Sequence, residues 1–196
     1  MEARPPLWRS SLHATSNVLE NQSNTISMLI AIISDTHDNL PNLKKVLEYC
    51  RVQKVAKLIH CGDLATLETL DFINNNFSGE IFFTFGNMDD GHIADYPFED
   101  NQYKNTQIFP DFGKLEIADK KVAFVHYPTV AKQLCETGEF DFVFHGHTHK
   151  PWTEVINNCT LLNPGNVANQ YYPPTFAVWN TSDNIFQLIR INELPQ

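Results

Sequence analysis

From residue 28 onward, short apolar runs alternate with segments whose apolar residues recur at helical spacing. The run 28–34 is almost continuously apolar, which is typical of a strand buried on both faces of a sheet. Pro41 suits the first turn of a helix, and apolar residues follow it at i, i+3, i+4 and i+7 spacing through Cys50. Next come a strand over 57–61, a helix with apolar residues from Leu64 to Ile73 that ends in the asparagine run 74–76, and a strand over 80–85. This β-α-β-α-β order predicts parallel strands joined by right-handed crossovers.

The second half of the chain changes to paired strands joined by short polar turns. Three such hairpins are expected, within residues 114–126, 153–162 and 175–191. A helix over Pro128–Glu136 and a strand over 140–144 separate the first two hairpins. Two packed sheets with helices on the outside fit both halves, so the sequence predicts an α/β domain.

Residues 1–27 differ from the rest because they show little periodicity. They contain five serines, three asparagines and the pair Pro5–Pro6. We therefore expect a flexible N-terminal extension over residues 1–27 and a folded domain over residues 28–196. Met28 opens the first strand directly and is a candidate natural start. The arginines and serines of the extension leave a targeting segment as the weaker alternative.

Composition and charge narrow the functional classes. Of the 196 residues, 42% are hydrophobic and 19% are charged, which excludes a disordered or fibrous chain and suits one domain with a real core. The longest apolar run is far shorter than the ~20 residues of a membrane helix, so no membrane association is expected. A formal net charge of −9 argues against stable nucleic-acid binding. Bound metal ions can still supply the positive charge that phosphate chemistry needs.

The four cysteines are Cys50, Cys61, Cys135 and Cys159, and none belongs to a CxxC motif. No apolar secretory signal is recognisable near the N-terminus. We expect buried, reduced thiols in a cytoplasmic protein, while the sequence alone leaves a disulfide open.

Reactive side chains recur just beyond the ends of the predicted strands, where α/β sheets gather their functional residues. Seven such residues follow five strands: Asp35, His37, Asp63, Asn87, His126, His147 and His149. Asp35 and His37 are two residues apart, so an extended segment would point both side chains the same way, and His147 and His149 share this relation. Seven donors are too many for one tetrahedral zinc ion, whereas two ions that share a carboxylate use them all.

Each of these residues also has an ordinary structural role. Asp35 and Asp63 suit helix caps, Asn87 after Gly86 suits a turn, and His126 alone suits the core. Clusters at five strand ends are improbable as independent accidents. We therefore interpret the seven residues as one metal centre.

Together these motifs resemble the calcineurin-like metallophosphoesterase superfamily over roughly residues 28–192. The matching positions are Asp35-x-His37, Gly62-Asp63, Gly86-Asn87, His126 and Gly146-His147-x-His149. The opening Ile-Ser-Asp-Thr-His-Asp-Asn and the segment Asn163-Pro164-Gly165-Asn166 are similar to its small prokaryotic phosphodiesterase branch. The resemblance implies an α/β fold that is a four-layer α/β/β/α sandwich of two mixed sheets with outer helices.

The resemblance also implies how the ligands are shared between two ions. One ion takes Asp35, His37 and His149, the other takes Asn87, His126 and His147, and Asp63 bridges both. No catalytic residue beyond these ligands is implied.

Two positions depart from the superfamily pattern. Many members carry a histidine at the position of Met88 that protonates the leaving group, and a thioether cannot donate a proton. Met88 fits the small branch, which often lacks that histidine, and it predicts a preference for good leaving groups. The family usually has glycine where this chain has Tyr127, so this ring puts the choice of substrate in doubt.

These residues lead to the hypothesis of a metallophosphoesterase, in which a hydroxide bridging two divalent ions hydrolyses small phosphodiesters. The imidazole-rich ligand set favours Mn, Ni, Zn, Fe or Co over Mg. A phosphomonoesterase and a catalytically weak protein-interaction scaffold of the same fold are the alternatives. The expected partner is a small phosphoester, and a homo-oligomer is a candidate state.

Neighbouring polar residues receive secondary roles. We expect Asp38 and Asp89 to accept hydrogen bonds from ligand histidines. His145 is a weaker candidate ligand, His92 is a speculative acid in a loop after the third strand, and His60 is expected in the core. The expected core also contains Phe82, Phe83, Phe85, Phe142 and Phe144.

Overall fold

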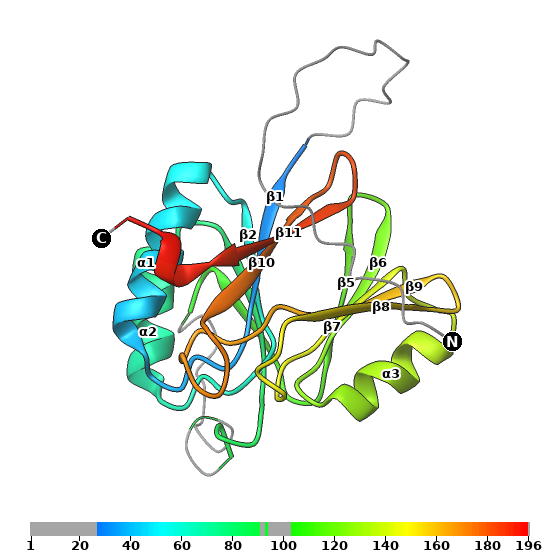
Figure 1. The fold of residues 1–196 in the computed structure, drawn as a ribbon, viewed down its shortest axis with the longest axis horizontal. Coiled ribbons are helices and arrows are strands. Elements are labelled where there is room, and N and C mark those ends of the chain that lie inside the picture. Colours follow the sequence, from blue (N-terminus) through cyan, green and yellow to red (C-terminus); the bar gives the residue numbers. More distant parts are fainter. Residues whose placement is uncertain (1–26, 91–92, 94–102, 196) are drawn as a thin grey trace.

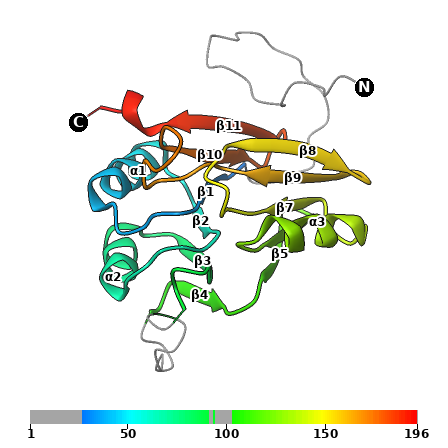
Figure 2. The same cartoon turned by 60° about the horizontal axis from the view of Figure 1, so that its bottom comes forward.

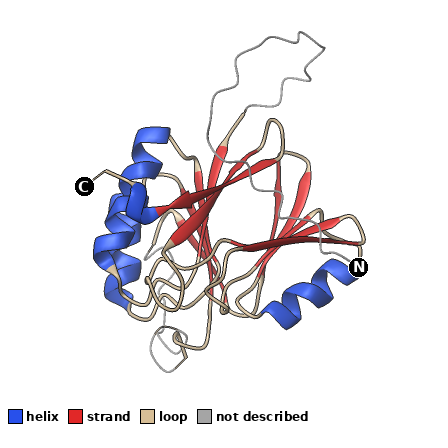
Figure 3. Ribbon diagram, viewed as in Figure 1, coloured by secondary structure: helices blue, strands red, loops and turns tan. Residues whose placement is uncertain are grey.

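In the computed structural model, which describes residues 27–90, 93 and 103–195, two mixed β-sheets pack face to face between outer helices (Figure 1). The helices α1 (Leu40–Gln53) and α2 (Leu67–Asn76) cover one sheet, and α3 (Pro128–Glu136) covers the other. Figure 3 shows the strands gathered between the helices. The expected four-layer sandwich is therefore confirmed.

The first sheet has the strand order β11-β10-β1-β2-β3-β4. Its strands are β1 (Leu29–Ile33), β2 (Lys57–His60), β3 (Glu80–Thr84), β4 (Thr106–Phe109), β10 (Thr175–Asn180) and β11 (Ile185–Arg190). The strands β1 to β4 run parallel, β10 pairs antiparallel with β1, and β11 pairs antiparallel with β10. The last hairpin of the chain thus extends the first sheet, and a short 3-10 helix (Ile191–Glu193) follows it.

Two helices lie on the outer face of this sheet, α1 (Leu40–Gln53) and α2 (Leu67–Asn76). The side chain of Asn39 caps α1 by accepting a hydrogen bond from the Asn42 N–H at 3.1 Å. The expected apolar face of α1 is buried, from Leu43 to Cys50. These helices and the sheet enclose the first of three apolar cores.

The second sheet has the strand order β5-β6-β7-β9-β8. Figure 2 shows β8, β9 and β7 of this sheet side by side. Its strands are β5 (Gly113–Ile117), β6 (Lys120–Phe124), β7 (Phe142–Phe144), β8 (Trp152–Ile156) and β9 (Cys159–Asn163). The three inner strands run parallel, and the edge strands β5 and β8 run antiparallel to their neighbours. The helix α3 (Pro128–Glu136) packs on the outer face and encloses the third core.

The middle core lies between the two sheets and is rich in aromatic rings. Trp179 of the first sheet meets Phe142 of the second with their ring centroids 5.0 Å apart. Phe124 and Phe144 are fully buried in the same layer. Large aromatic side chains that pack between the sheets fix the position of one sheet relative to the other. The loops at the edge that the sheets share are therefore held in fixed positions as well.

Several local predictions differ from the structure. The pattern did not reveal β4, because this strand has four residues and a mostly half-buried surface without alternation. The helix α2 begins at Leu67 and not at Leu64, since the N–H groups of Leu64 and Ala65 donate to Asp89, which lies in the loop after β3. The asparagine run 74–76 belongs to the last turn of α2.

The expectation of four reduced thiols is wrong for two of them. Cys135 on α3 and Cys159 on β9 form a disulfide, with their Cα atoms 5.4 Å apart. The pairing arises because α3 lies directly over β9, a proximity that spacing along the chain does not reveal. Cys50 and Cys61 are free and buried.

Two further expectations concern the N-terminal extension and membrane-spanning helices. Residues 1–26 lie outside the described part, so the flexible extension and the domain boundary stay predictions. None of the described helices is long and apolar enough to cross a membrane.

Candidate metal centre

The loops that follow five strands meet at one edge of the paired sheets and carry the predicted ligands. Asp35 and His37 follow β1, and the others follow β2, β3, β6 and β7: Asp63, Asn87, His126, and the pair His147 and His149. The carboxylates of Asp35 and Asp63 are buried, as are the rings of His126 and His149. Buried polar groups need partners, and these groups find them in one another.

One group of donor atoms gathers around Asp35. Its Oδ1 lies 3.2 Å from His149 Nε2 and 3.9 Å from His37 Nε2. The two Nε2 atoms face each other at 3.3 Å. A carboxylate and two imidazoles therefore converge on one point.

A second group of donor atoms gathers around Asn87. Its Oδ1 lies 3.2 Å from His126 Nε2 and 3.1 Å from His147 Nδ1. These two nitrogens are themselves 3.2 Å apart. An amide oxygen and two imidazoles thus form a second convergence point.

Asp63 stands between the two groups. Its Oδ2 lies 3.6 Å from His37 Nε2 in the first group and 3.4 Å from His126 Nε2 in the second. Its Oδ1 is turned away and accepts a hydrogen bond from the Met88 N–H at 2.8 Å. That bond fixes the carboxylate so that a single oxygen faces both groups.

The donor set fits two divalent cations. Donors that share an ion at about 2.1 Å lie about 3.0–3.5 Å from each other, close to most of the separations found here. Two groups of three residues have ligand atoms that all lie within 4.8 Å of one another, and Asp35 belongs to both groups. The first group also contains His37 and His149, and the second contains Asp63 and His126. The structure brings all seven predicted residues together, and their role as metal ligands stays a prediction.

Hydrogen bonds to the backbone orient two of the histidines. His126 Nδ1 lies 2.9 Å from the Cys61 carbonyl oxygen, and His149 Nδ1 lies 3.3 Å from that of Gln170. Because a carbonyl only accepts, each Nδ1 carries a proton, and in the neutral ring each Nε2 presents a lone pair to the centre. This is the tautomer that a metal ligand requires.

The backbone at the centre is not extended, so that part of the sequence argument is wrong. Asp35, His37, Asp63, His147 and His149 all have φ between 41° and 69°. This left-handed region is uncommon for residues with a Cβ and costs of order 1–3 kcal/mol per residue. The side chains converge because tight loops turn them inward, and such strain is concentrated at functional sites.

Two glycines allow the loops to approach one another. A Cβ on Gly86 would collide with Asp63, and a Cβ on Gly146 would overlap the Ser34 hydroxyl. The loop after β1 is bonded to the loop after β2, where the N–H groups of Thr36 and His37 both donate to the Asp63 carbonyl. The centre is thus built on closely packed backbone.

Asp38 and Asp89 do not bond to the ligand histidines, which corrects the expectation for both. The buried Asp89 carboxylate accepts four backbone N–H groups, from Gly86 and from residues 63–65. Asp38 accepts from the hydroxyls of Thr66 and Thr69 instead. Both carboxylates hold loops, whereas carbonyl oxygens orient His126 and His149.

Mutual charges shift the pKa values at the centre. Burial raises the pKa of Asp63, but the His126 hydrogen bond, the positive potential of His126 and the Met88 N–H outweigh it, so the net pKa is lowered. Burial lowers the pKa of His126, but Asp63 and Asp35 reverse this and raise it. The Asp35 hydrogen bond raises the pKa of His149, while burial lowers that of His37. These carboxylates therefore attract positive charge.

Two other described histidines, His60 and His145, lie outside the cluster of donors. His60 is buried in the core as expected, with its Nε2 2.8 Å from Thr36 Oγ1. His145 is buried and its Nδ1 contacts the Gly146 carbonyl, so the structure does not bring it to the other ligands. His92 lies outside the described residues.

Three exposed side chains surround the centre. The ring of Tyr127 lies 5.1 Å from that of His126 and 5.2 Å from that of His147, measured between centroids. The ring of Tyr171, which is 90% exposed, lies 5.3 Å from that of His149. Met88 is 44% exposed beside Asn87, as its position in the motif implies.

Sequence reasoning noted the segment 163–166 but gave it no role. The Asn163 amide donates to the Gly146 carbonyl at 2.9 Å and to Thr148 Oγ1 at 3.0 Å. The Asn166 amide donates to the carbonyl of His149 at 3.1 Å. Both asparagines therefore brace the loop that carries His147 and His149. An Asn-Pro-Gly-Asn run is a turn signal, but it does not say which loop it supports.

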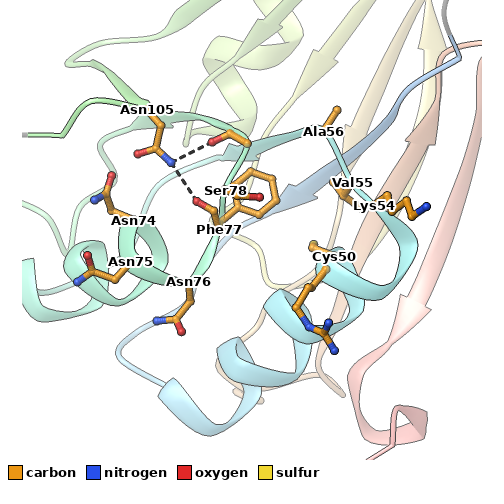
Figure 4. A pocket seen from close by; sticks show the side chains of 12 residues that line it. Cys50, Lys54, Val55, Ala56, Asn74, Asn75, Asn76, Phe77, Ser78 and Asn105 are labelled. Carbon is orange, nitrogen blue, oxygen red and sulfur yellow. Dashed lines mark hydrogen bonds between the residues drawn. The ribbon is translucent and has the colours of Figure 1, made fainter.

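One hollow in the described part of the chain lies away from the candidate centre. It has a volume of about 760 Å³ and lies at the C-terminal ends of α1 and α2, where Cys50, Lys54 and the run from Asn74 to Gly79 line it (Figure 4). In Figure 4, Asn105 bridges the carbonyls of Phe77 and Gly79 in its wall. None of the seven candidate ligands lines this hollow.

Comparison with known proteins gives a consistent picture. Residues 28–184 match the family model described as the calcineurin-like phosphoesterase superfamily domain. The chain is 31% identical over 165 residues to a protein named Phosphodiesterase MJ0936 from Methanocaldococcus jannaschii. The matched region covers 83% of this chain and 98% of that protein. It is 29% identical over 167 residues to a probable metallophosphoesterase, MJ0623, of the same organism, covering 80% and 74%.

Solved structures agree with the fold. A structure described as a novel archaeal phosphodiesterase matches with a TM-score of 0.71 and 28% identity, covering 83% of this chain and 99% of that chain. Vacuolar protein sorting 29 from Cryptosporidium parvum matches with a TM-score of 0.60 and 18% identity, covering 79% and 85%. The second likeness concerns the fold alone.

Proposed function

The chain belongs to the calcineurin-like phosphoesterase superfamily, and on this basis we propose that it is a metal-dependent phosphodiesterase acting on small phosphodiesters. The similarity to a protein named as a phosphodiesterase, which this chain covers almost fully, supports the diester as substrate. The acidic net charge of −9 favours a small substrate over folded nucleic acid.

One observation carries the proposal of two metal ions. Asp63 Oδ2 lies within 3.6 Å of a histidine nitrogen from each of the two donor groups, and its other oxygen is held by the Met88 N–H. We assign Asp35, His37 and His149 to one ion, Asn87, His126 and His147 to the other, and Asp63 to both. Four imidazoles favour Mn, Ni, Zn, Fe or Co over Mg. Bound in this way, two divalent ions supply an activated water molecule and neutralise charge on the phosphoryl group.

The residues of the chain then have distinct tasks. In the neutral rings of His126 and His149 the Nδ1 proton is directed to a carbonyl oxygen, which leaves the Nε2 lone pair for a metal ion. The Asn87 amide group offers an N–H donor to a phosphate oxygen while its Oδ1 faces the histidines. The ring of Tyr127 narrows the access of the substrate to the second group of donor atoms, beside His126 and His147. No described side chain of the motif set offers a proton to the leaving group where Met88 stands, so good leaving groups are preferred.

The test compares two esters on protein that has been stripped of metal and reloaded. Hydrolysis of bis-p-nitrophenyl phosphate and of p-nitrophenyl phosphate is followed with Mn, Ni, Zn or Mg. We expect faster hydrolysis of the diester and little activity with Mg. A faster monoester reaction would indicate a phosphomonoesterase. If the folded protein hydrolyses neither ester with any of the ions, the alternative of a protein-interaction scaffold of the same fold remains.

The location of the protein in the cell and its oligomeric state are two further expectations. A cytoplasmic location and a homo-oligomeric state stay proposals. The disulfide between Cys135 and Cys159 bears on the first, because reducing compartments keep most cysteines as thiols. The number of free thiols in protein isolated from its host under alkylating conditions decides whether the pair is closed there.

A further inference from the structure

A second hollow, of about 450 Å³, lies beside the candidate metal centre on the outer face of the second sheet. Its walls come from the start of α3, from the loop that carries His147 and His149, and from the edge strand β8. On the proposed function, we propose that this hollow binds the non-leaving ester group of the substrate, a flat ring with an N–H donor such as a nucleobase. The residues that carry the argument are Lys132, His145, Thr148, Lys150 and Trp152.

The hollow adjoins the centre through its own lining. Thr148 stands between His147 and His149 in the chain. Pro128 follows Tyr127, whose ring lies 5.2 Å from that of His147. A phosphodiester held at the centre has one ester group leaving and one remaining. The remaining group therefore has a hollow within reach on this side.

His145 provides a hydrogen-bond acceptor in this hollow. The side chain is only 5% exposed, and its Nδ1 donates to the Gly146 carbonyl at 3.0 Å. The Nε2 atom of the neutral ring is then an acceptor, and among the described residues it has no hydrogen-bond partner. Every fully buried side-chain nitrogen or oxygen of the described residues has a hydrogen-bond partner, so this Nε2 is reached by solvent, and His145 lines the hollow. An N–H donor on a ligand in the hollow can replace that solvent contact.

The remaining walls suit a flat ring attached to an anion. The indole of Trp152 is 39% exposed, and Lys150 Nζ lies 5.5 Å from its ring centroid. Lys132 and Lys150 form no ion pair with any described residue, although Glu154 also lines the hollow. Indole rings stack on nucleobases, and free ammonium groups attract phosphate oxygens. Because the protein has a net charge of −9, the two neighbouring lysines, Lys132 and Lys150, favour the binding of an anionic ligand in this hollow.

Two diesters with the same leaving group test the proposal. Thymidine 5′-phosphate p-nitrophenyl ester carries a base with an N–H donor, whereas methyl p-nitrophenyl phosphate has nothing to fill the hollow. In Trp152→Ala and Lys132→Ala we expect kcat/KM for the nucleoside ester to fall about 10-fold, mainly through KM. The methyl ester should change by less than about twofold. Val155→Ala on the same strand and Lys44→Ala on the outer face of α1 serve as matched controls.

A binding measurement separates this inference from the proposed function. Trp8 is replaced by Phe in all proteins of this experiment, which leaves Trp152 and the fully buried Trp179 as fluorophores. Titration with thymidine 5′-monophosphate should then quench the fluorescence of the protein with Trp152 and not that of Trp152→Phe. If both esters are hydrolysed but the variants lose kcat/KM equally for the two, the proposed subsite is wrong while the proposed function stands. Quenching that is retained in Trp152→Phe would have the same meaning. If neither ester is hydrolysed, the proposed function fails, and the titration still decides whether the hollow binds a nucleotide.

Discussion

The carboxylate of Asp89 accepts the backbone N–H of Asp63, with 2.9 Å between Asp89 Oδ2 and Asp63 N. The same carboxylate accepts three further N–H groups, so it determines where Asp63 stands. In Asp89→Asn one acceptor becomes an amide donor and faces N–H groups. We expect the free energy of unfolding to fall by about 2–4 kcal/mol and metal affinity to fall about 10–100-fold.

Urea unfolding and metal titration measure these two effects. Asp119→Asn is the matched control, because Asp119 is exposed in the turn between β5 and β6 and its positive φ also suits asparagine. An Asp89→Asn protein with unchanged metal affinity would contradict this account of how Asp63 is positioned.

Asp63→Asn tests the shared ligand directly. Asparagine keeps one oxygen but removes the negative charge that faces His37 and His126. We expect binding of both ions to weaken and hydrolysis to fall at least about 100-fold. Metal content after dialysis against a weak chelator measures the stoichiometry. Asp38→Asn, at the same edge but bonded to Thr66 and Thr69, should retain both ions. Two ions retained in Asp63→Asn would exclude the bridging role.

The sequence allowed the seven donors to be predicted because each follows a strand, and parallel strands bring such positions to one edge. Their geometry was not predictable in the same way. Five of the seven lie in left-handed turns that depend on contacts between loops, such as those of Gly86 with Asp63. Asp89 was assigned to the wrong partner because backbone N–H groups carry no sequence signal. The strand β4 and the disulfide likewise depend on contacts distant in the chain.

Met88→His tests the role of the missing proton donor. Met88 is 44% exposed beside Asn87, so an imidazole has room at this position. We expect esters with poor, alkyl-type leaving groups to be hydrolysed about 10–100-fold faster, with little change for p-nitrophenyl esters. Rates for a series of leaving groups of different pKa measure the effect. Met88→Leu should behave like the wild type. An equal gain for every leaving group would argue against proton donation.

The disulfide between Cys135 and Cys159 predicts the number of accessible thiols. Protein denatured without reductant should show two thiols, from Cys50 and Cys61, and four after reduction. Because the bond closes a segment of 24 residues, Cys159→Ser should lower the free energy of unfolding by about 3 kcal/mol. Reductant should destabilise the wild type to a similar extent and leave Cys159→Ser unchanged. Four thiols without reductant would restore the expectation from the sequence.

His60 predicts a loss of stability in acid for the metal-free protein. The Gly62 N–H donates to His60 Nδ1 at 3.2 Å, so the ring is neutral with its proton on Nε2 beside Thr36. Burial lowers the pKa of His60 from 6.5 to about 3. Between these values the unfolded chain binds a proton that the folded chain does not. The stabilisation is therefore complete above pH 6.5 and is lost as the pH falls toward about 3.

The slope that His60 contributes is at most about 1.4 kcal/mol per pH unit. Urea unfolding in the presence of a chelator, from about pH 7.5 down to about pH 4.5, measures it. His60→Gln should show a shallower dependence on pH than the wild type. His145, whose pKa burial lowers to about 4, acts in the same direction but is present in both proteins, so the difference isolates His60. Equal slopes in the two proteins would mean that His60 does not titrate differently on folding.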